Sequence, residues 1–121
     1  MKNKYILITG TSSGMGEAIS KLLAENGYTV FAGVRSEKAF QKWLTLENSN
    51  ILPLKLDVTF ENEITEAIQK VRSIVKENGL FALINNAGNN YSTPTECYEE
   101  CKARNLMETH FWGMASLTRH C

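Results

Sequence analysis

A glycine-rich turn placed between an apolar strand and a helix is the feature that most restricts the folds open to this chain. Residues 4–9, KYILIT, have the length and apolar character of a buried strand. The stretch TGTSSGMG, residues 9–16, overlaps its end, and apolar residues then recur at helical spacing over 17–26. The order strand, glycine-rich turn, helix is the context that a nucleotide-binding fingerprint requires.

Each glycine of the turn has its own physical role in that interpretation. Gly10 allows the tight turn, Gly14 lets backbone approach a pyrophosphate, and Gly16 lets the helix pack closely on the strand. The phosphates would lie at the helix N-terminus, where free N–H groups and the positive end of the helix dipole favour anions. An ordinary glycine-rich turn is the alternative. A P-loop is excluded, because no Gly-Lys-Ser/Thr follows.

The rest of the chain continues the alternation of strands and helices. Apolar runs predict strands over 28–34, 51–58 and 80–85, and Pro53 favours an edge position for its strand. Strands that alternate with helices of this length form βαβ units and a parallel sheet. Because such crossovers are right-handed, we expect an α/β, doubly wound (Rossmann) parallel sheet with strand order 3-2-1-4 in one domain, residues 1–121.

Capping residues and apolar spacing predict where the helices lie. Ser36 can cap a helix with an apolar face, and a strongly amphipathic helix covers 64–75. The stretch Thr93-Pro94-Thr95-Glu96 has the pattern of a capping box with proline at the first helical position. It predicts a last, continuous helix over about 94–119.

Composition limits the partners and the compartment. The formal net charge of the 121 residues is zero, so nothing indicates nucleic acid or an anionic membrane as a partner. No apolar stretch approaches the length of a transmembrane helix. Three cysteines are an odd number without secretory context, which predicts reduced thiols and a cytoplasmic location.

Three motifs together carry a family resemblance. The turn TGTSSGMG resembles the Thr-Gly-x-x-x-Gly-x-Gly of short-chain dehydrogenases/reductases, and Leu56-Asp57-Val58-Thr59 and Asn85-Asn86-Ala87-Gly88 resemble two further motifs of that family. The wording of the motifs is most similar to the retinol and hydroxysteroid dehydrogenase branch. The resemblance implies that a dinucleotide binds at Gly10, Thr11, Ser12, Ser13, Gly14, Met15, Gly16, Asp57, Val58, Asn86, Ala87 and Gly88.

The end of the second predicted strand bears on the choice of dinucleotide. NAD-binding sites place an acidic residue there for the ribose hydroxyls, but this chain has Val34 followed by Arg35. A guanidinium suits a 2′-phosphate through charge-assisted hydrogen bonds. We therefore expect NADP(H) to be preferred, with NAD(H) as the alternative; Arg35 on a solvated loop is the alternative explanation.

The resemblance also implies catalytic residues that are not found in their expected place. The family uses a serine and a Tyr-x-x-x-Lys pair that follow the helix after strand 4, and this chain stops at that helix, at roughly half the usual family length. Tyr98 and Lys102 have the right letters but come one helix too early, and we interpret them as a chance match, with Tyr98 packed and Lys102 in solvent beside Glu99. We expect the chain to be the inactive cofactor-binding part of a truncated oxidoreductase; a non-enzymatic dinucleotide module or sensor, or a subunit completed by another chain, is the alternative.

His110 stands where the family often has an asparagine that supports a proton relay. Loss of function followed by drift and retention for another role are both open. Zinc-ligand residue types occur in the last segment, but a continuous helix cannot fold them around one ion, so no metal is expected. These residues are Cys97, Cys101, His110, His120 and Cys121.

Apolar side chains occupy several faces of the last predicted helix, and strand 4 is expected to be an exposed sheet edge. One face can cover the sheet, but that cannot hide every apolar residue. We therefore expect a homo-oligomer or aggregate through this helix. The apolar residues are Leu106, Met107, Phe111, Trp112, Met114 and Leu117.

Overall fold

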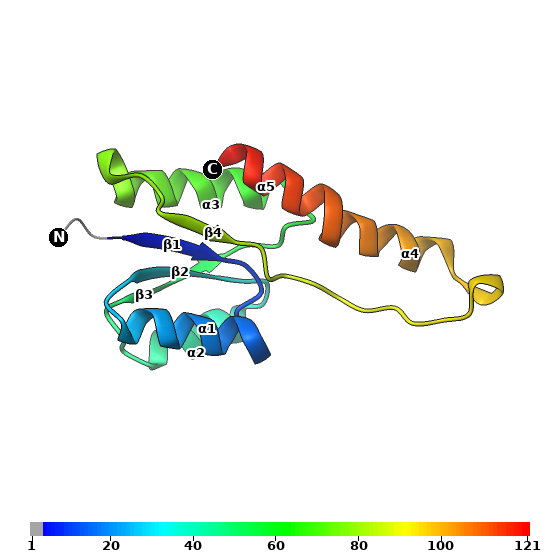
Figure 1. Ribbon diagram of the computed structural model, residues 1–121, viewed down its shortest axis with the longest axis horizontal. Coiled ribbons are helices and arrows are strands. Elements are labelled where there is room, and N and C mark those ends of the chain that lie inside the picture. The colour runs from blue at the N-terminus through cyan, green and yellow to red at the C-terminus, as the bar shows by residue number, and fades with distance from the viewer. Residues whose placement is uncertain (1–3) are drawn as a thin grey trace.

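A four-stranded parallel sheet organises the computed structural model, which describes residues 4–121 (Figure 1). The strands are β1 (Tyr5–Ile8), β2 (Thr29–Val34), β3 (Ile51–Lys55) and β4 (Ala82–Ile84), and their spatial order is β3-β2-β1-β4. All three strand pairings are parallel. The predicted α/β class and strand order 3-2-1-4 are confirmed, and β3 with Pro53 lies at an edge.

Helices cover both faces of the sheet, so the strands are apolar on both sides. Helices α1 (Gly14–Glu25) and α2 (Glu37–Thr45) lie on one face, and α3 (Glu61–Val75) and α5 (Met114–His120) lie on the other (Figure 1). Alternate residues of β1 supply the two cores: Tyr5 and Leu7 face α3, whereas Ile6 and Ile8 face α1 and α2.

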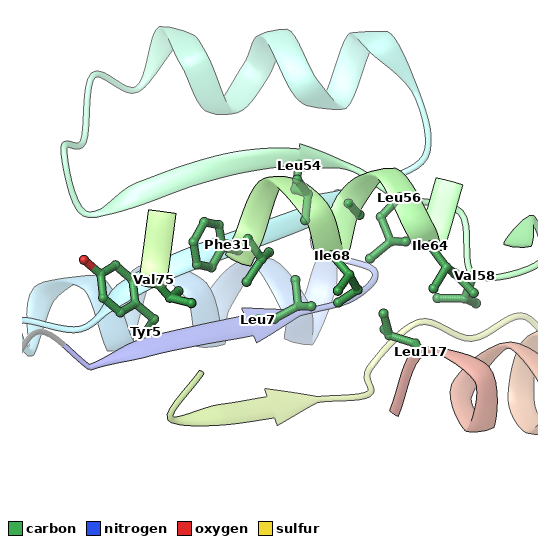
Figure 2. Packing of buried hydrophobic residues seen from close by; sticks show 12 residues of the cluster. Tyr5, Leu7, Phe31, Leu54, Leu56, Val58, Ile64, Ile68, Val75 and Leu117 are labelled. Carbon is green, nitrogen blue, oxygen red and sulfur yellow. The ribbon is translucent and has the colours of Figure 1, made fainter. Parts of the chain in front are cut away.

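The larger core joins the sheet to α3 and α5. Figure 2 shows Leu7 and Phe31 of the sheet in the same cluster as Ile64 and Ile68 of α3, with Leu117 joining it from α5. Leu7 and Leu117 have no exposed surface. Because Leu117 is the only residue of α5 that is buried, this side chain docks the end of the chain onto the core.

Most helix boundaries follow the sequence signals. The Ser36 side chain accepts a hydrogen bond from the Ala39 N–H at 3.2 Å, as predicted for the cap of α2. Helix α3 begins at Glu61 and contains all the apolar positions between 64 and 75 that predicted it, and a short 3₁₀ turn, η1 (Lys76–Asn78), follows it. The strand predicted over 51–58 ends at Lys55, so 56–58 belong to a loop.

The last helix is where the sequence prediction is wrong. The capping box at 93–96 does not start a helix: Pro94 is extended, with ψ of 144°, and Thr95–Cys97 form a 3₁₀ turn, η2. Helix α4 (Glu100–Met107) begins only after Glu99. The Glu99 N–H donates to the Tyr91 hydroxyl at 2.8 Å, a contact across eight residues that local capping preferences do not anticipate.

A π-helical turn interrupts the predicted continuous helix. This turn, η3 (Glu108–Gly113), separates α4 from α5. A Cβ on Gly113 would overlap the Val58 carbonyl oxygen and lie 2.7 Å from the Glu108 oxygen, so only glycine lets the turn press against the loop after β3. Residues 89–99 and α4 extend away from the sheet as an arm, and α4 has no buried residue (Figure 1).

Candidate functional site

A cavity of about 300 Å³ opens at the carboxyl ends of the parallel strands, where doubly wound sheets bind their ligands. Its wall includes ten of the thirteen residues predicted to bind the cofactor. Two more residues, Leu56 and Thr109, were not in that prediction. The full wall consists of Gly10, Ser12, Ser13, Met15, Arg35, Leu56, Asp57, Val58, Asn86, Ala87, Gly88 and Thr109.

The three remaining predicted residues do not line the cavity but determine the conformation and packing of the glycine-rich turn. Thr11 is fully buried, and both its N–H and its hydroxyl donate to the Gly33 carbonyl, at 3.0 and 3.1 Å. Gly14 has a φ of +59°, which favours glycine although nothing lies near its missing Cβ. A Cβ on Gly16 would overlap the Gly10 carbonyl and approach Asn86 Nδ2 to 2.5 Å. Gly16 therefore packs the helix against the turn and Asn86, rather than against the strand as predicted.

Thr9 and Asn86 join the ends of β1 and β4. The Thr9 hydroxyl oxygen accepts hydrogen bonds from the N–H groups of Asn86 and Ala87, at 3.0 and 2.9 Å. In return, the Asn86 side-chain amide donates to the Thr9 and Gly10 carbonyls, at 3.1 and 2.9 Å. These four bonds satisfy backbone groups that the strands leave unpaired and fix Ala87 against Gly10. Thr9 was thus missed as a positioning residue, although it begins the motif.

The first turn of α1 supplies donors for an anion. Ser13 is the N-cap residue, but its side chain makes no capping hydrogen bond, so the first N–H groups of α1 are not capped by it. Ser12, Ser13 and Met15 line the cavity beside this helix end. Free N–H groups and the helix dipole fit the phosphates of a dinucleotide.

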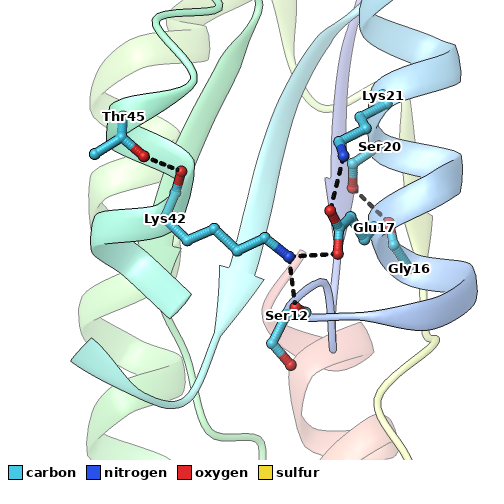
Figure 3. Close-up of polar contacts among 7 residues, drawn as sticks. All are labelled: Ser12, Gly16, Glu17, Ser20, Lys21, Lys42 and Thr45. Atoms are coloured by element: carbon cyan, nitrogen blue, oxygen red, sulfur yellow. Dashed lines mark hydrogen bonds and ion pairs between the residues drawn. The ribbon is translucent and has the colours of Figure 1, made fainter. Parts of the chain in front are cut away.

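Lys42 of α2, which does not line the cavity, connects α2 to the glycine-rich turn and to α1. Figure 3 shows its side chain reaching across to Glu17, with Nζ 2.6 Å from Glu17 Oε2 and 3.4 Å from the Ser12 carbonyl oxygen. Lys21 contacts the other Glu17 oxygen at 2.7 Å. Hydrogen bonds from Lys21 and then Lys42 hold the pKa of Glu17 below its usual value. The two lysines thereby neutralise the one carboxylate in the first turn of α1.

Arg35 directly follows β2, which ends at Val34. It is exposed, and it lines both the main cavity and a neighbouring hollow of about 280 Å³ formed with Ser12, Ser36 and Asp57. The side-chain ion pairs found within residues 4–121 do not include Arg35. Its guanidinium and the two serine hydroxyls form a donor set suited to a phosphate.

Asp57 is held at the rim of the same hollow. Its Oδ1 accepts from the Thr59 N–H at 2.9 Å and from the Thr59 hydroxyl at 2.7 Å. The Asp57 N–H donates to Glu63 Oε2 at 2.7 Å, which ties this loop to the first turn of α3. Asp57 is therefore preorganised, with its second carboxylate oxygen outside these contacts.

Tyr98 and Lys102 lie on the arm and are not part of the cavity wall. Tyr98 precedes the N-cap of α4 and exposes 54% of its surface, so the prediction that it packs is wrong. Lys102 lies in solvent, with Nζ 2.6 Å from Glu99 Oε1, as predicted. The two do not share a helix face, because the chain is extended at Tyr98.

His110 lies next to the cavity on the π-helical turn. Its Nε2 is 2.8 Å from the Asn89 carbonyl oxygen and 3.2 Å from the Asn89 nitrogen. Together with Thr9 and Thr109 it borders a small hollow of about 60 Å³ behind the main cavity. Thr109 belongs to the same π-helical turn and lines the main cavity, a position that the sequence prediction of a continuous helix did not include.

The described residues do not gather a cluster of three or more histidine, cysteine, aspartate or glutamate side chains that could hold a metal ion. Cys97, Cys101 and Cys121 are free and exposed. Although Cys121 is exposed as a residue, its sulfur is partly desolvated; this raises the pKa of the thiol, and nearby Arg72 partly opposes the effect. Within residues 4–121, we find no helix with the length and apolar character needed to span a membrane.

Known proteins resemble this chain in sequence and in fold. A 3-amino-tetrahydro-pyrrolizinone reductase of Xenorhabdus hominickii is 37% identical over 98% of this chain, and human 17-beta-hydroxysteroid dehydrogenase type 2 is 33% identical over 96%. The chain spans 40% and 31% of these two relatives. Retinol dehydrogenases are also among the relatives, with 29% identity to the human type 16 enzyme, as the motif wording predicted.

A crystal structure of a short-chain dehydrogenase from Streptomyces avermitilis superposes with a TM-score of 0.88 and 31% identity, covering 98% of this chain and 43% of that one. A family profile described as short chain dehydrogenase matches residues 4–121. Its match runs from β1 through α5 and includes all three motifs that surround the cavity. The chain belongs to the short-chain dehydrogenase family.

Proposed function

We propose that this chain binds NADP(H) in preference to NAD(H), as the cofactor-binding part of an oxidoreductase. The observation that carries the cofactor preference is the hollow at the end of β2, which is lined by Arg35, Ser12, Ser36 and Asp57 and in which Arg35 is the one cation among the described residues. A 2′-phosphate there would receive charge-assisted hydrogen bonds. The residue at the end of β2 is Val34, so the ribose hydroxyls of NAD would find no carboxylate at that strand end.

The remaining wall fits the other parts of a dinucleotide. The N-terminus of α1 suits the pyrophosphate, Asp57 can accept a hydrogen bond from the adenine amino group, and Ala87 and Gly88 border the nicotinamide-ribose side. The bound cofactor would supply or accept a hydride at the carbon of an alcohol or carbonyl substrate. The chain's own residues orient the dinucleotide and neutralise its phosphates.

The affinities of the purified chain for NADPH and NADH, measured by calorimetry, test this proposal. Arg35→Ala should lower the preference for NADPH about ten- to a hundredfold, because a hydrogen bond to a charged group contributes about 1.5–3 kcal/mol. Lys38→Ala removes an exposed cation outside the cavity wall and serves as the matched control. An unchanged ratio of the two dissociation constants in Arg35→Ala would refute the NADP assignment.

A second candidate is a dinucleotide-binding module without chemistry of its own, or a subunit completed by another chain. It is favoured by the composition of the wall, in which the described residues include neither a tyrosine nor a lysine to donate a proton. Stoichiometric NADPH binding without carbonyl reduction would support this candidate. A reading frame that continues with a serine and a Tyr-x-x-x-Lys would support the enzyme fragment.

Self-association through the last helical segment remains part of the proposal. Met107, Phe111, Trp112 and Met114 expose between 39% and 58% of their surfaces, and together they offer an apolar surface to a second copy. A monodisperse monomer by light scattering at micromolar concentration would refute it. We also propose a cytoplasmic location, for which the three exposed free thiols are the support.

A further inference from the structure

We propose that His110 is a positioning residue that fixes the nicotinamide end of the cavity by holding the backbone at Gly88 and Asn89. This inference rests on the proposed dinucleotide binding and assigns a role to a residue that does not itself line the main cavity. It also favours retention of the histidine for a role over drift.

The first support is the pair of contacts between the imidazole and the Asn89 backbone. Nε2 lies 2.8 Å from the Asn89 carbonyl oxygen and 3.2 Å from its nitrogen. A ring protonated on Nε2 donates to the carbonyl, and a ring protonated on Nδ1 accepts from the N–H. Either tautomer is therefore bonded to Asn89, so the contact does not depend on one proton position.

The second support is the packing of the same ring on Gly88. A Cβ at Gly88 would lie 2.9 Å from His110 Cε1 and 3.5 Å from Nε2. Gly88 is also one of the residues that line the main cavity. The imidazole therefore backs the wall at this position, and a shift of the ring would move backbone that borders the ligand.

The third support is a set of further contacts made by the residues on both sides of this hydrogen bond. The Asn89 side chain donates to Asn105 Oδ1 at 2.7 Å, so the same residue is tied to α4 as well. His110 itself is carried by the π-helical turn, which Gly113 presses against Val58. The 88–89 backbone is thus held between the sheet and the base of the arm.

The two ends of the cavity are separate, which makes the role of His110 testable. The hollow with Arg35 shares Ser12 and Asp57 with the main cavity, whereas the hollow with His110 shares Val58, Ala87 and Thr109. A ligand that fills only the Arg35 end should not sense His110. Adenosine 2′,5′-bisphosphate is such a probe, because it carries the phosphates and adenine but lacks the nicotinamide half.

The experiment measures the affinities of the full chain for NADPH and for adenosine 2′,5′-bisphosphate by calorimetry. His110→Phe keeps an aromatic ring but loses the hydrogen bonds. It should weaken NADPH binding roughly three- to tenfold while leaving the affinity for the bisphosphate within twofold. His110→Gln places an amide donor and acceptor near the position of Nε2 and should restore NADPH binding to within about twofold.

Hydrogen exchange of the Asn89 amide gives a second readout that does not need a ligand. Exchange should become faster in His110→Phe and return toward the original rate in His110→Gln. Equal weakening of both ligands would show a merely structural role, and unchanged NADPH affinity in His110→Phe would also overturn the inference. If the unaltered chain binds the bisphosphate and NADPH but His110→Phe binds them equally well, only this inference fails; if the unaltered chain binds neither, the proposed function fails with it.

Discussion

The sheet with its four covering helices is stabilised by buried apolar cores, whereas the arm of residues 89–107 is stabilised by individual polar contacts. In the first region, alternate strand residues enter two cores, and Leu7, Ile8 and Val30 have no exposed surface. In the arm, α4 buries no residue, and its boundary depends on single polar contacts such as the one from Glu99 to Tyr91. The cavity lies where the two regions meet, with Gly88 at its wall and Asn89 as the first residue of the arm.

The two ends of the cavity are therefore held in place by different kinds of interaction. The end of the cavity at the glycine-rich turn is built on β1, β2 and α1, which pack in the two cores. The Gly88 end is held by hydrogen bonds from Asn89 to His110 and Asn105, which contribute less than core burial. Substitutions should therefore have large effects on stability in the sheet region and small ones in the arm.

The largest expected difference is between the core and α4. Leu7→Ala should lower the free energy of unfolding by about 2–5 kcal/mol, because it removes buried methyl groups and leaves a cavity. Met107→Ala, at a side chain that is 52% exposed, should change it by about 0.5 kcal/mol or less. Urea denaturation measures both, and similar losses would show that the arm is as firmly packed as the sheet.

A smaller loss is expected at the junction between β1 and β4. Thr9→Val removes the acceptor for two backbone N–H groups and should cost about 1–3 kcal/mol. Thr9→Ser keeps the hydroxyl and should recover most of that stability. Thr95→Val in the arm, at an exposed position, is the matched control. If Thr9→Val and Thr95→Val unfolded at the same urea concentration, the Thr9 bonds would not contribute to the fold.

The smallest effect is the pH dependence of the ion pairs around Glu17. Because its pKa in the folded state is lowered, Glu17 adds stability above its ordinary value of 4.5 and loses that contribution as the pH falls through the lowered pKa. Solvent screens both lysines, so the contribution is about 1 kcal/mol or less. The urea midpoint should fall between pH 7 and pH 3, and less so in Glu17→Gln.

Glu99→Gln provides the corresponding test in the arm. Its pair with Lys102 spans three residues of one segment, and both side chains are more than half exposed. This substitution should leave the pH dependence of unfolding as it is in the unaltered chain. A loss of pH dependence as large as in Glu17→Gln would contradict the contrast between the two regions.

Local sequence patterns were sufficient for the sheet and for most of the cavity wall. The strand order followed from alternating apolar segments and right-handed crossovers. Nine wall residues were implied by the family resemblance of three motifs at strand ends, and Arg35 was predicted from its place after the second strand. Boundaries were less well predicted, because β3 ends at Lys55 although its apolar pattern ran to 58. At these positions the hydrogen-bonding partners come from other elements, as with Glu63 and Asp57.

By itself, the sequence determined the parallel sheet, its order and the glycine-rich turn, because periodicity and glycine conformation act over a few residues. Only the tertiary structure decided where α4 begins, that a π-helical turn follows it, that Lys42 reaches Glu17, and that His110 holds Asn89. Each of these depends on two residues that are separated along the chain and meet only after the sheet and its helices have packed. A local sequence pattern carries no information on contacts between residues that are distant in the sequence.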